Sequence, residues 1–130
     1  MLEYNALKSD FLADKYYDFD SLQGDRKSLS IRISKVGGDK VEIIFSPAMS
    51  YRCIDEGDAL VTSHEMSSAG CFGDALYEAK NSLFLQSFLK ERFEDENRIN
   101  YRHFCISTND EIIDVIALEA PVIRLSSLKI

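Results

Sequence analysis

The stretch LSIRISKVGGDKVEIIF, residues 29–45, decides the fold of this chain. Its apolar residues alternate with polar ones on both sides of a glycine pair, which is the period of a half-buried β-strand. Gly37, Gly38 and Asp39 lie between the two halves and are typical of a tight turn. The stretch therefore predicts an antiparallel hairpin with one apolar face.

The following segment, SPAMSYRCIDEGD at residues 46–58, breaks the strand and then resumes it. Pro47 has no N–H for a ladder, so the backbone must kink, bulge or reach a sheet edge there. Residues 51–54 and 59–63 predict a second hairpin on either side of an acidic turn. Neighbouring carboxylates repel one another, so Asp55, Glu56 and Asp58 should face water or a cationic partner.

Tyr51 and Arg52 are predicted to anchor this acidic turn. Adjacent residues of a strand point to opposite faces of the sheet, so the two side chains cannot act on one substrate atom. Tyr51 should pack inward beside Phe45. Arg52 should bind one of the turn carboxylates, because its planar fork accepts a carboxylate through two parallel hydrogen bonds. Both residues are expected to be structural rather than catalytic.

One helix is clearly indicated, beginning at Leu83 and ending at Phe93. Ser82 precedes it and has a side chain suited to capping the first turn. The apolar residues that follow recur on one helical face. They are Leu85, Phe88, Leu89 and Phe93. The acids at residues 94–96 oppose the negative end of the helix dipole and disfavour a longer helix.

The remaining segments indicate mainly strands. Residues 101–106 and 112–118 have strand patterns, and residues 122–125 after Pro121 predict a short edge strand. Residues 2–20 fit a helix or a strand, and residues 71–79 fit a strand or an irregular segment. No linker or repeat divides the chain. We predict one globular domain over residues 1–130, of the α+β class, with a mostly antiparallel sheet and one main amphipathic helix.

Composition narrows the classes of partner. The net charge is −7 over 130 residues, and the basic residues are scattered, so nucleic acid is not an expected partner. An acidic protein attracts basic proteins, although acidity also serves solubility alone. No apolar run is long enough to span a bilayer, and the first residues lack a secretory signal. Three cysteines without an export signal indicate reduced thiols and a cytoplasmic protein.

Five residues are candidates for metal ligands or for parts of a thiol nucleophile. They are Cys53, His64, Cys71, His103 and Cys105. Their spacing lacks the close ligand pairs of zinc sites, and no local signature marks a catalytic cysteine. The glycines lack the spacing of phosphate loops, and the acidic turn lacks that of a calcium loop. We therefore expect no catalytic, cofactor-binding or metal-binding residue, and no enzyme activity.

The chain resembles a family of small acidic bacterial proteins of unassigned activity. The pattern is a strand that ends in Phe, a Tyr-Arg pair, an Asp-Glu-Gly-Asp turn and an apolar residue. In this sequence these are Phe45, Tyr51, Arg52, Asp55, Glu56, Gly57, Asp58 and Leu60. Later matches are Asn81-Ser82 before a helix with Phe84, Leu85 and Phe88, then Tyr101-Arg102-His103-Phe104, Asp114-Val115-Ile116 and Glu119-Ala120-Pro121. The resemblance covers about residues 31–121.

Such proteins are similar to immunity proteins, which neutralise toxins in bacterial contact-dependent growth inhibition. The resemblance implies a protein-binding inhibitor whose partner is a basic toxin domain, and it identifies no catalytic residue. Charge and exposure then make Asp55, Glu56 and Asp58 the expected partner-binding residues. The alternative is a structural domain that self-associates through an exposed sheet edge. A small cysteine- or metal-dependent enzyme is the third reading.

Overall fold

The computed structural model describes residues 2–12, 17–25, 27–35, 37–71, 74–92 and 99–126. Within these ranges the chain forms nine β-strands, two α-helices and one short 3₁₀ turn, η1. In chain order they are β1 Glu3–Ala6, β2 Asp18–Gly24, β3 Leu29–Ser34, β4 Lys40–Phe45, β5 Ala48–Asp55, η1 Glu56–Asp58, α1 Leu60–Ser68, β6 Leu76–Lys80, α2 Leu83–Glu91, β7 Arg102–Ser107, β8 Glu111–Ala117 and β9 Val122–Leu125.

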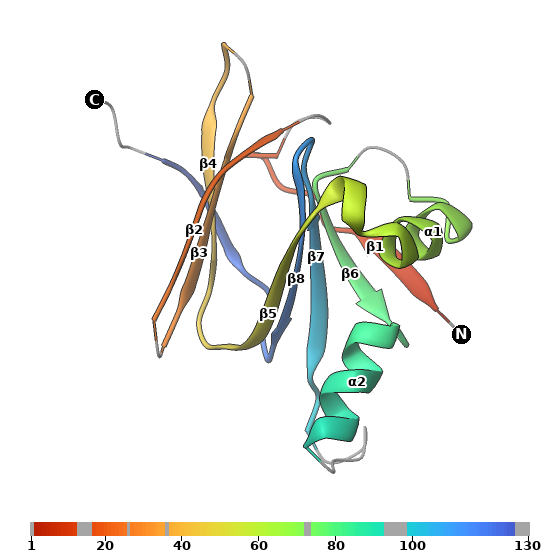
Figure 1. Cartoon of the computed structure of the whole chain (residues 1–130). Helices are drawn as coiled ribbons and strands as arrows, with labels where there is room; N and C mark the ends of the chain where they lie inside the picture. The colour runs from red at the N-terminus through yellow and green to blue at the C-terminus, as the bar shows by residue number, and fades with distance from the viewer. Residues whose placement is uncertain are drawn as a thin grey trace.

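The strands build two antiparallel sheets that pack face to face (Figure 1). One sheet has the order β1-β6-β7-β8-β5 and the other β2-β3-β4-β9. Alternating strands place branched and aromatic side chains between the sheets, where they are removed from water. The main members of this core are Leu29, Ile31, Ile33, Val41, Ile43, Phe45, Phe104, Ile106, Ile113 and Val115. The predicted α+β class with a mostly antiparallel sheet is confirmed.

The hairpin predicted at residues 29–45 is confirmed. β3 and β4 pair from Leu29 opposite Phe45 to Ser34 opposite Lys40. Gly37 in the turn has a φ of 69°, a left-handed conformation that glycine adopts without strain. The alternation of apolar and polar residues therefore fixed both the register and the buried face, because a slip by one residue would expose the whole apolar set.

The predicted break at Pro47 is also confirmed, and it is the place where the chain changes sheet. β4 belongs to the four-stranded sheet and β5 to the five-stranded sheet, with a cis peptide bond at Ser46-Pro47 between them. β8 and β9 make the same change in the opposite direction, and β9 is the predicted edge strand, paired with β4. Of residues 2–20, the described parts contain the strand β1 and the start of β2.

Both helices cover the outer face of the five-stranded sheet, away from the second sheet (Figure 1). Ser82 caps α2 as predicted, since its hydroxyl accepts a hydrogen bond from the backbone N–H of Leu85. Leu85 and Leu89 are buried against the sheet, and Phe88 is half-buried. The helix ends at Glu91, and the predicted end at Phe93 lies outside the described residues.

The second hairpin predicted around the acidic turn is wrong. β5 ends at Asp55, the turn η1 follows, and the chain then forms α1 rather than a returning strand. The apolar and β-branched residues Leu60, Val61 and Thr62 favour a strand by local propensity. Tertiary packing overrides that propensity, because Thr62 and Met66, four residues apart, both face the sheet, as one side of a helix requires.

Candidate functional site

The acidic turn is one part of a larger acidic surface. Asp55, Glu56 and Asp58 are all exposed, as predicted. Two more carboxylates, those of Asp110 and Glu111, lie beside them where β7 turns into β8. Asp55 lies directly opposite Glu111 across the β5–β8 ladder. The backbone N–H of Glu56 also donates to the carbonyl of Asp110 over 2.9 Å.

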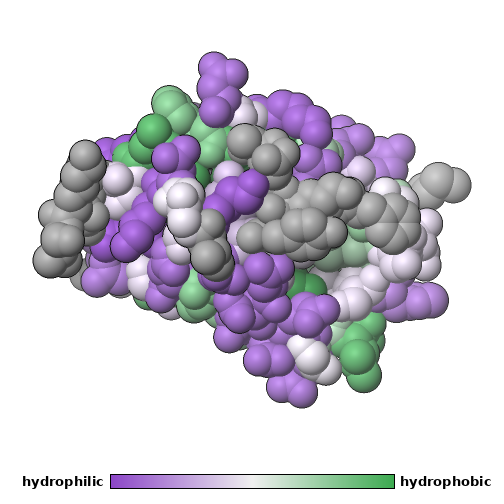
Figure 2. All heavy atoms as spheres, turned by 90° about the horizontal axis from the view of Figure 1, so that it is seen from above, coloured by the Kyte–Doolittle hydropathy of each residue, from purple (hydrophilic) through white to green (hydrophobic). Residues whose placement is uncertain are grey.

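The start of β2 extends this surface further. The Asn109 side chain donates to Asp18 over 2.9 Å, and the Phe19 N–H donates to the Asp110 carboxylate over 3.0 Å. Three segments distant in sequence therefore bring their carboxylates to one end of the molecule, which we call the acidic end. Its members are Asp18, Asp55, Glu56, Asp58, Asp110 and Glu111. Figure 2 views the molecule from the end that carries the β7–β8 turn and shows a largely hydrophilic surface with separate hydrophobic groups.

The acidic end is not neutralised by the lysines and arginines that the structure describes. Within the part of the chain that the structure describes, none of its carboxylates forms an ion pair with a lysine or arginine. Like charges directly opposite on neighbouring strands, such as Asp55 and Glu111, destabilise a sheet. The backbone nevertheless holds them in place, since the Gly57 N–H donates to Asp55 over 2.9 Å. The arrangement concentrates negative charge at a fixed position.

Arg52 does not anchor the acidic turn, so that prediction is wrong. Its Nη2 lies 2.6 Å from Oδ2 of Asp114, its Nε lies 3.2 Å from the same oxygen, and Nη2 also donates to Thr62. The strand register explains why Arg52 binds Asp114 and not a carboxylate of the acidic turn. Asp114 on β8 lies directly opposite Arg52 on β5, and both side chains are on the same face of the sheet. The guanidinium also stacks on the ring of Phe84 at 4.6 Å.

Tyr51 does not pack inward beside Phe45 as predicted, because it is 50% exposed. β5 is an edge strand of its sheet, so a side chain on that strand has a neighbouring strand on one side alone. The phenol ring instead lies close to Gly24 at the end of β2. Arg52 on the opposite face is half-buried, so the predicted division of the two side chains between the faces holds.

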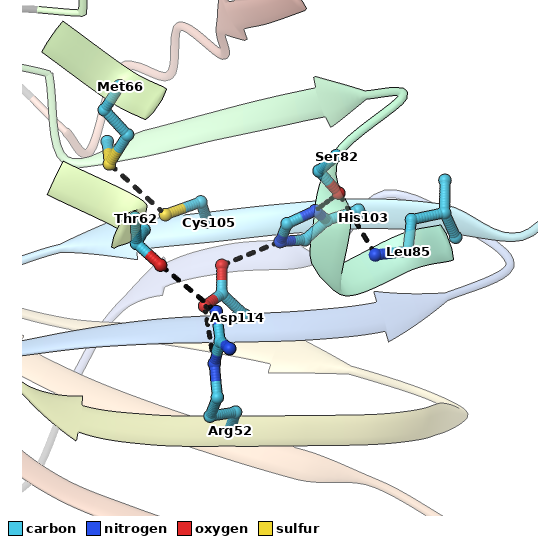
Figure 3. Close-up of polar contacts among 8 residues, drawn as sticks. All are labelled: Arg52, Thr62, Met66, Ser82, Leu85, His103, Cys105 and Asp114. Carbon is cyan, nitrogen blue, oxygen red and sulfur yellow. Dashed lines mark hydrogen bonds and ion pairs between the residues drawn. The ribbon is translucent and has the colours of Figure 1, made fainter. Parts of the chain in front are cut away.

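Asp114 belongs to a buried relay of polar side chains between the two helices and the sheet (Figure 3). Its Oδ1 lies 2.7 Å from Nε2 of His103, and Nδ1 of His103 lies 2.5 Å from the hydroxyl of Ser82. Each of these three residues is 1% exposed. The relay therefore joins β5, β8 and β7 to the start of α2, and Thr62 joins it to α1 through Arg52.

Every side-chain polar atom of Ser82, His103 and Asp114 has a partner. When His103 is neutral, Nδ1 accepts from the Ser82 hydroxyl and Nε2 donates to Asp114; when it is protonated, both ring nitrogens donate. Burial alone raises the pKa of the Asp114 carboxyl, but the hydrogen bonds and charges of His103 and Arg52 together outweigh it and hold that pKa below its usual range. A satisfied buried network of this kind fixes the relative positions of the elements it joins.

The order serine, histidine, aspartate invites comparison with a hydrolytic triad, but the serine hydroxyl is buried in this structure. A nucleophilic hydroxyl must reach a substrate. Ser82 is buried, and its oxygen already accepts the capping hydrogen bond from Leu85. The relay is suited to holding α2 on the sheet. The sequence carried one signal of it, since Asp114 is a lone charge inside the apolar run IIDVI at residues 112–116.

The five candidate metal ligands do not form one cluster, although Cys71 packs against the cluster that contains Cys105. Among the residues described, no group of three or more histidine, cysteine or acidic side chains is arranged to hold a metal ion. Cys105 is buried against Met66, and burial raises the pKa of its thiol. Burial and then the neighbouring Glu111 raise the pKa of Cys53, which disfavours the reactive thiolate. His64 is exposed on α1.

A separate groove of about 550 Å³ lies between α2 and the ends of β6 and β7. Leu85, Leu89 and Tyr101 form its apolar part. Arg102 binds Glu78 in this groove through two hydrogen bonds of 2.9 and 2.7 Å. The Glu78 carboxylate in the groove is thus paired with a cation, unlike the carboxylates of the acidic end.

Comparisons with family models, curated proteins and solved structures found no match to this chain. No helix of the described ranges is long and apolar enough to cross a membrane.

Proposed function

We propose that this protein is a protein-binding inhibitor that uses the acidic end to bind a basic partner. The observation that carries the proposal is the placement of Asp55 opposite Glu111, with the other carboxylates of the acidic end around them and no cation of the described chain paired with them. An arrangement that destabilises the sheet is a candidate for function, because proteins break local rules chiefly where a site requires it.

The resemblance to immunity proteins names the kind of inhibitor. The partner would then be a basic toxin domain in the cytoplasm, neutralised by direct binding. Concentrated negative charge speeds the encounter with such a partner, since electrostatic steering raises association rates by about 10- to 1000-fold. Steering acts chiefly on the association rate and is weakened by salt.

The test is co-expression with the protein encoded beside this gene, followed by affinity capture and measurement of cell growth. The proposal expects capture of a basic domain and rescue of growth by the inhibitor. If the neighbouring protein is neither captured nor toxic, and no basic toxin domain of the same organism binds in its place, the proposal is wrong.

Charge placement is tested with two variants of equal net charge. The site variant carries Asp55→Asn, Glu56→Gln and Asp58→Asn. The control carries Glu3→Gln, Glu91→Gln and Glu119→Gln, three acids that are also exposed but lie away from the acidic end. The site variant should associate about ten-fold more slowly at low salt, and the control should lose much less. Equal losses in the two variants would assign the effect to net charge and exclude the turn as a steering site.

One observation favours a second candidate, a domain that self-associates through a sheet edge. β5 has eight residues, lies at an edge of the five-stranded sheet, and exposes Met49 and Tyr51. Unpaired strand edges are common templates for association. The net charge of −7 on each copy opposes it. Light scattering coupled to size exclusion decides between the two, because self-association requires a dimer mass for the protein alone.

A further inference from the structure

The helix α1 presents two of its three apolar residues to water, while the polar residue Thr62 faces the sheet beside Met66. Leu60 and Val61 are 72% and 64% exposed, although they are the first two residues of the helix. Thr62 and Met66 are the buried positions on the opposite side. A surface helix usually shows the reverse, with its apolar side against the core.

The contacts of the inner side keep α1 in this orientation. The Thr62 hydroxyl accepts a hydrogen bond from Arg52, and Met66 packs on Cys105 and Tyr77. A rotation that buried Leu60 would remove Thr62 from Arg52 and Met66 from its cluster. The two exposed side chains are therefore held outward by a rigid framework.

Leu60 and Val61 also adjoin the acidic end directly. Only Ala59 separates η1, which carries Glu56 and Asp58, from the start of α1. The chain thus places two adjacent exposed aliphatic side chains at the margin of the carboxylates. Single exposed aliphatic residues are ordinary on protein surfaces. An apolar pair fixed at the edge of an unpaired charge cluster has the composition of a binding interface, which combines an apolar centre with a polar rim.

We propose that Leu60 and Val61 form the apolar anchor of the partner-binding surface, and that they insert into an apolar pocket ringed by lysine or arginine side chains on the partner. This rests on the proposed function, because charge complementarity with the acidic end defines the partner as basic. The two parts of the surface then affect different rate constants of binding. Carboxylates speed the encounter, while desolvated apolar side chains slow dissociation.

The experiment measures binding kinetics of the purified protein to the basic domain captured in the co-expression test. One variant carries Leu60→Ser and Val61→Ser. The matched control is Leu83→Ser, which changes the first residue of the other helix, where leucine is 54% exposed. The anchor variant should dissociate about 10- to 100-fold faster, with an association rate within about two-fold of wild type and an unchanged salt dependence. The control should match wild type in both rates.

Each outcome can be assigned. If the wild-type protein binds and the anchor variant dissociates at the wild-type rate, the anchor proposal is overturned and the inhibitor proposal stands. An equal effect of Leu83→Ser would also overturn it, since the loss would not be local. If no basic domain binds the wild-type protein, both proposals fail. Melting temperatures within about 2 °C of wild type show that the variants are folded, and Leu60→Ala provides a milder second variant.

Discussion

Replacing Asp114 by asparagine tests the relay that joins the sheet to both helices. The carboxylate accepts three hydrogen bonds, two from Arg52 and one from Nε2 of His103. An amide of the same shape has one oxygen and one NH₂ group, so either Arg52 or His103 then faces a donor. Asp114 and His103 are each 1% exposed, and water cannot replace the lost partner there.

The expected loss follows from these contacts. Losing a hydrogen bond to a charged group costs about 1.5–3 kcal/mol, and leaving a buried donor unpaired costs about 1–3 kcal/mol. Their sum agrees with the loss of about 3–5 kcal/mol when one partner of a buried ion pair is removed. Because the Arg52 side chain is 37% exposed, it can turn toward water and recover part of the loss. We expect Asp114→Asn to lower the free energy of unfolding by about 3 kcal/mol.

Urea denaturation followed by circular dichroism measures this loss, provided that the m-value is unchanged. With an m-value of about 1.5 kcal/mol per molar, the midpoint should fall by about 2 M. The control is Asp58→Asn, which removes the same charge from an exposed position and should change stability by less than about 0.5 kcal/mol. A loss below about 1 kcal/mol for Asp114→Asn would refute the reasoning, because the carboxylate would then not hold both partners.

Three further predictions concern the fold. Arg52→Lys should destabilise the protein by about 1–2 kcal/mol in urea denaturation although the charge is kept, since an ammonium lacks the fork that reaches Asp114 and Thr62; an unchanged midpoint would contradict this. Leu89→Ala should cost about 2–5 kcal/mol because Leu89 is buried, whereas half-buried Phe88→Ala should cost less, about 2 kcal/mol, and equal losses would argue against this placement of α2. Stability should fall as the pH drops below about 4, because pKa values lowered in the folded state make carboxylates stabilising above their unfolded pKa. Asp114, Glu42 and Glu78 have such lowered pKa values. In Asp114→Asn the free energy of unfolding, measured by urea denaturation at several pH values, should therefore fall less steeply as the pH drops.

The predictable parts of the fold are those that local pattern determines. The alternation of apolar and polar residues from Leu29 to Phe45 was enough to predict the β3–β4 hairpin. A capping serine followed by apolar residues on one helical face was enough to predict α2. α1 was missed because its exposed leucine and valine give no helical apolar face. Arg52 was assigned to the wrong carboxylate because the acidic turn is near in sequence, whereas its partner is 62 residues away and is chosen by strand register.

The candidate site was predictable only where its residues are neighbours in the sequence. The turn at Asp55 was visible as a cluster of acids, but its neighbours Asp110 and Asp18 belong to segments that strand pairing brings together. The relay likewise joins residues 21 and 11 positions apart, with His103 in the middle. Nothing in local spacing indicates such contacts. Only Asp114, a charge within an apolar run, gave a signal that a buried partner was required.

The change of sheet at Ser46-Pro47 has a consequence for how the chain folds. β4 pairs with β9 in one sheet while its continuation, β5, pairs with β8 in the other, and the contact between Glu42 and Arg124 spans 82 residues. Closing such distant segments is entropically slow, so topologies rich in them fold in milliseconds to seconds rather than microseconds. During synthesis β3 and β4 are made well before residues 122–125, so one edge of β4 has no partner strand until those residues follow. The nascent protein therefore passes through a stage in which a buried strand of the finished molecule is an open template for other chains.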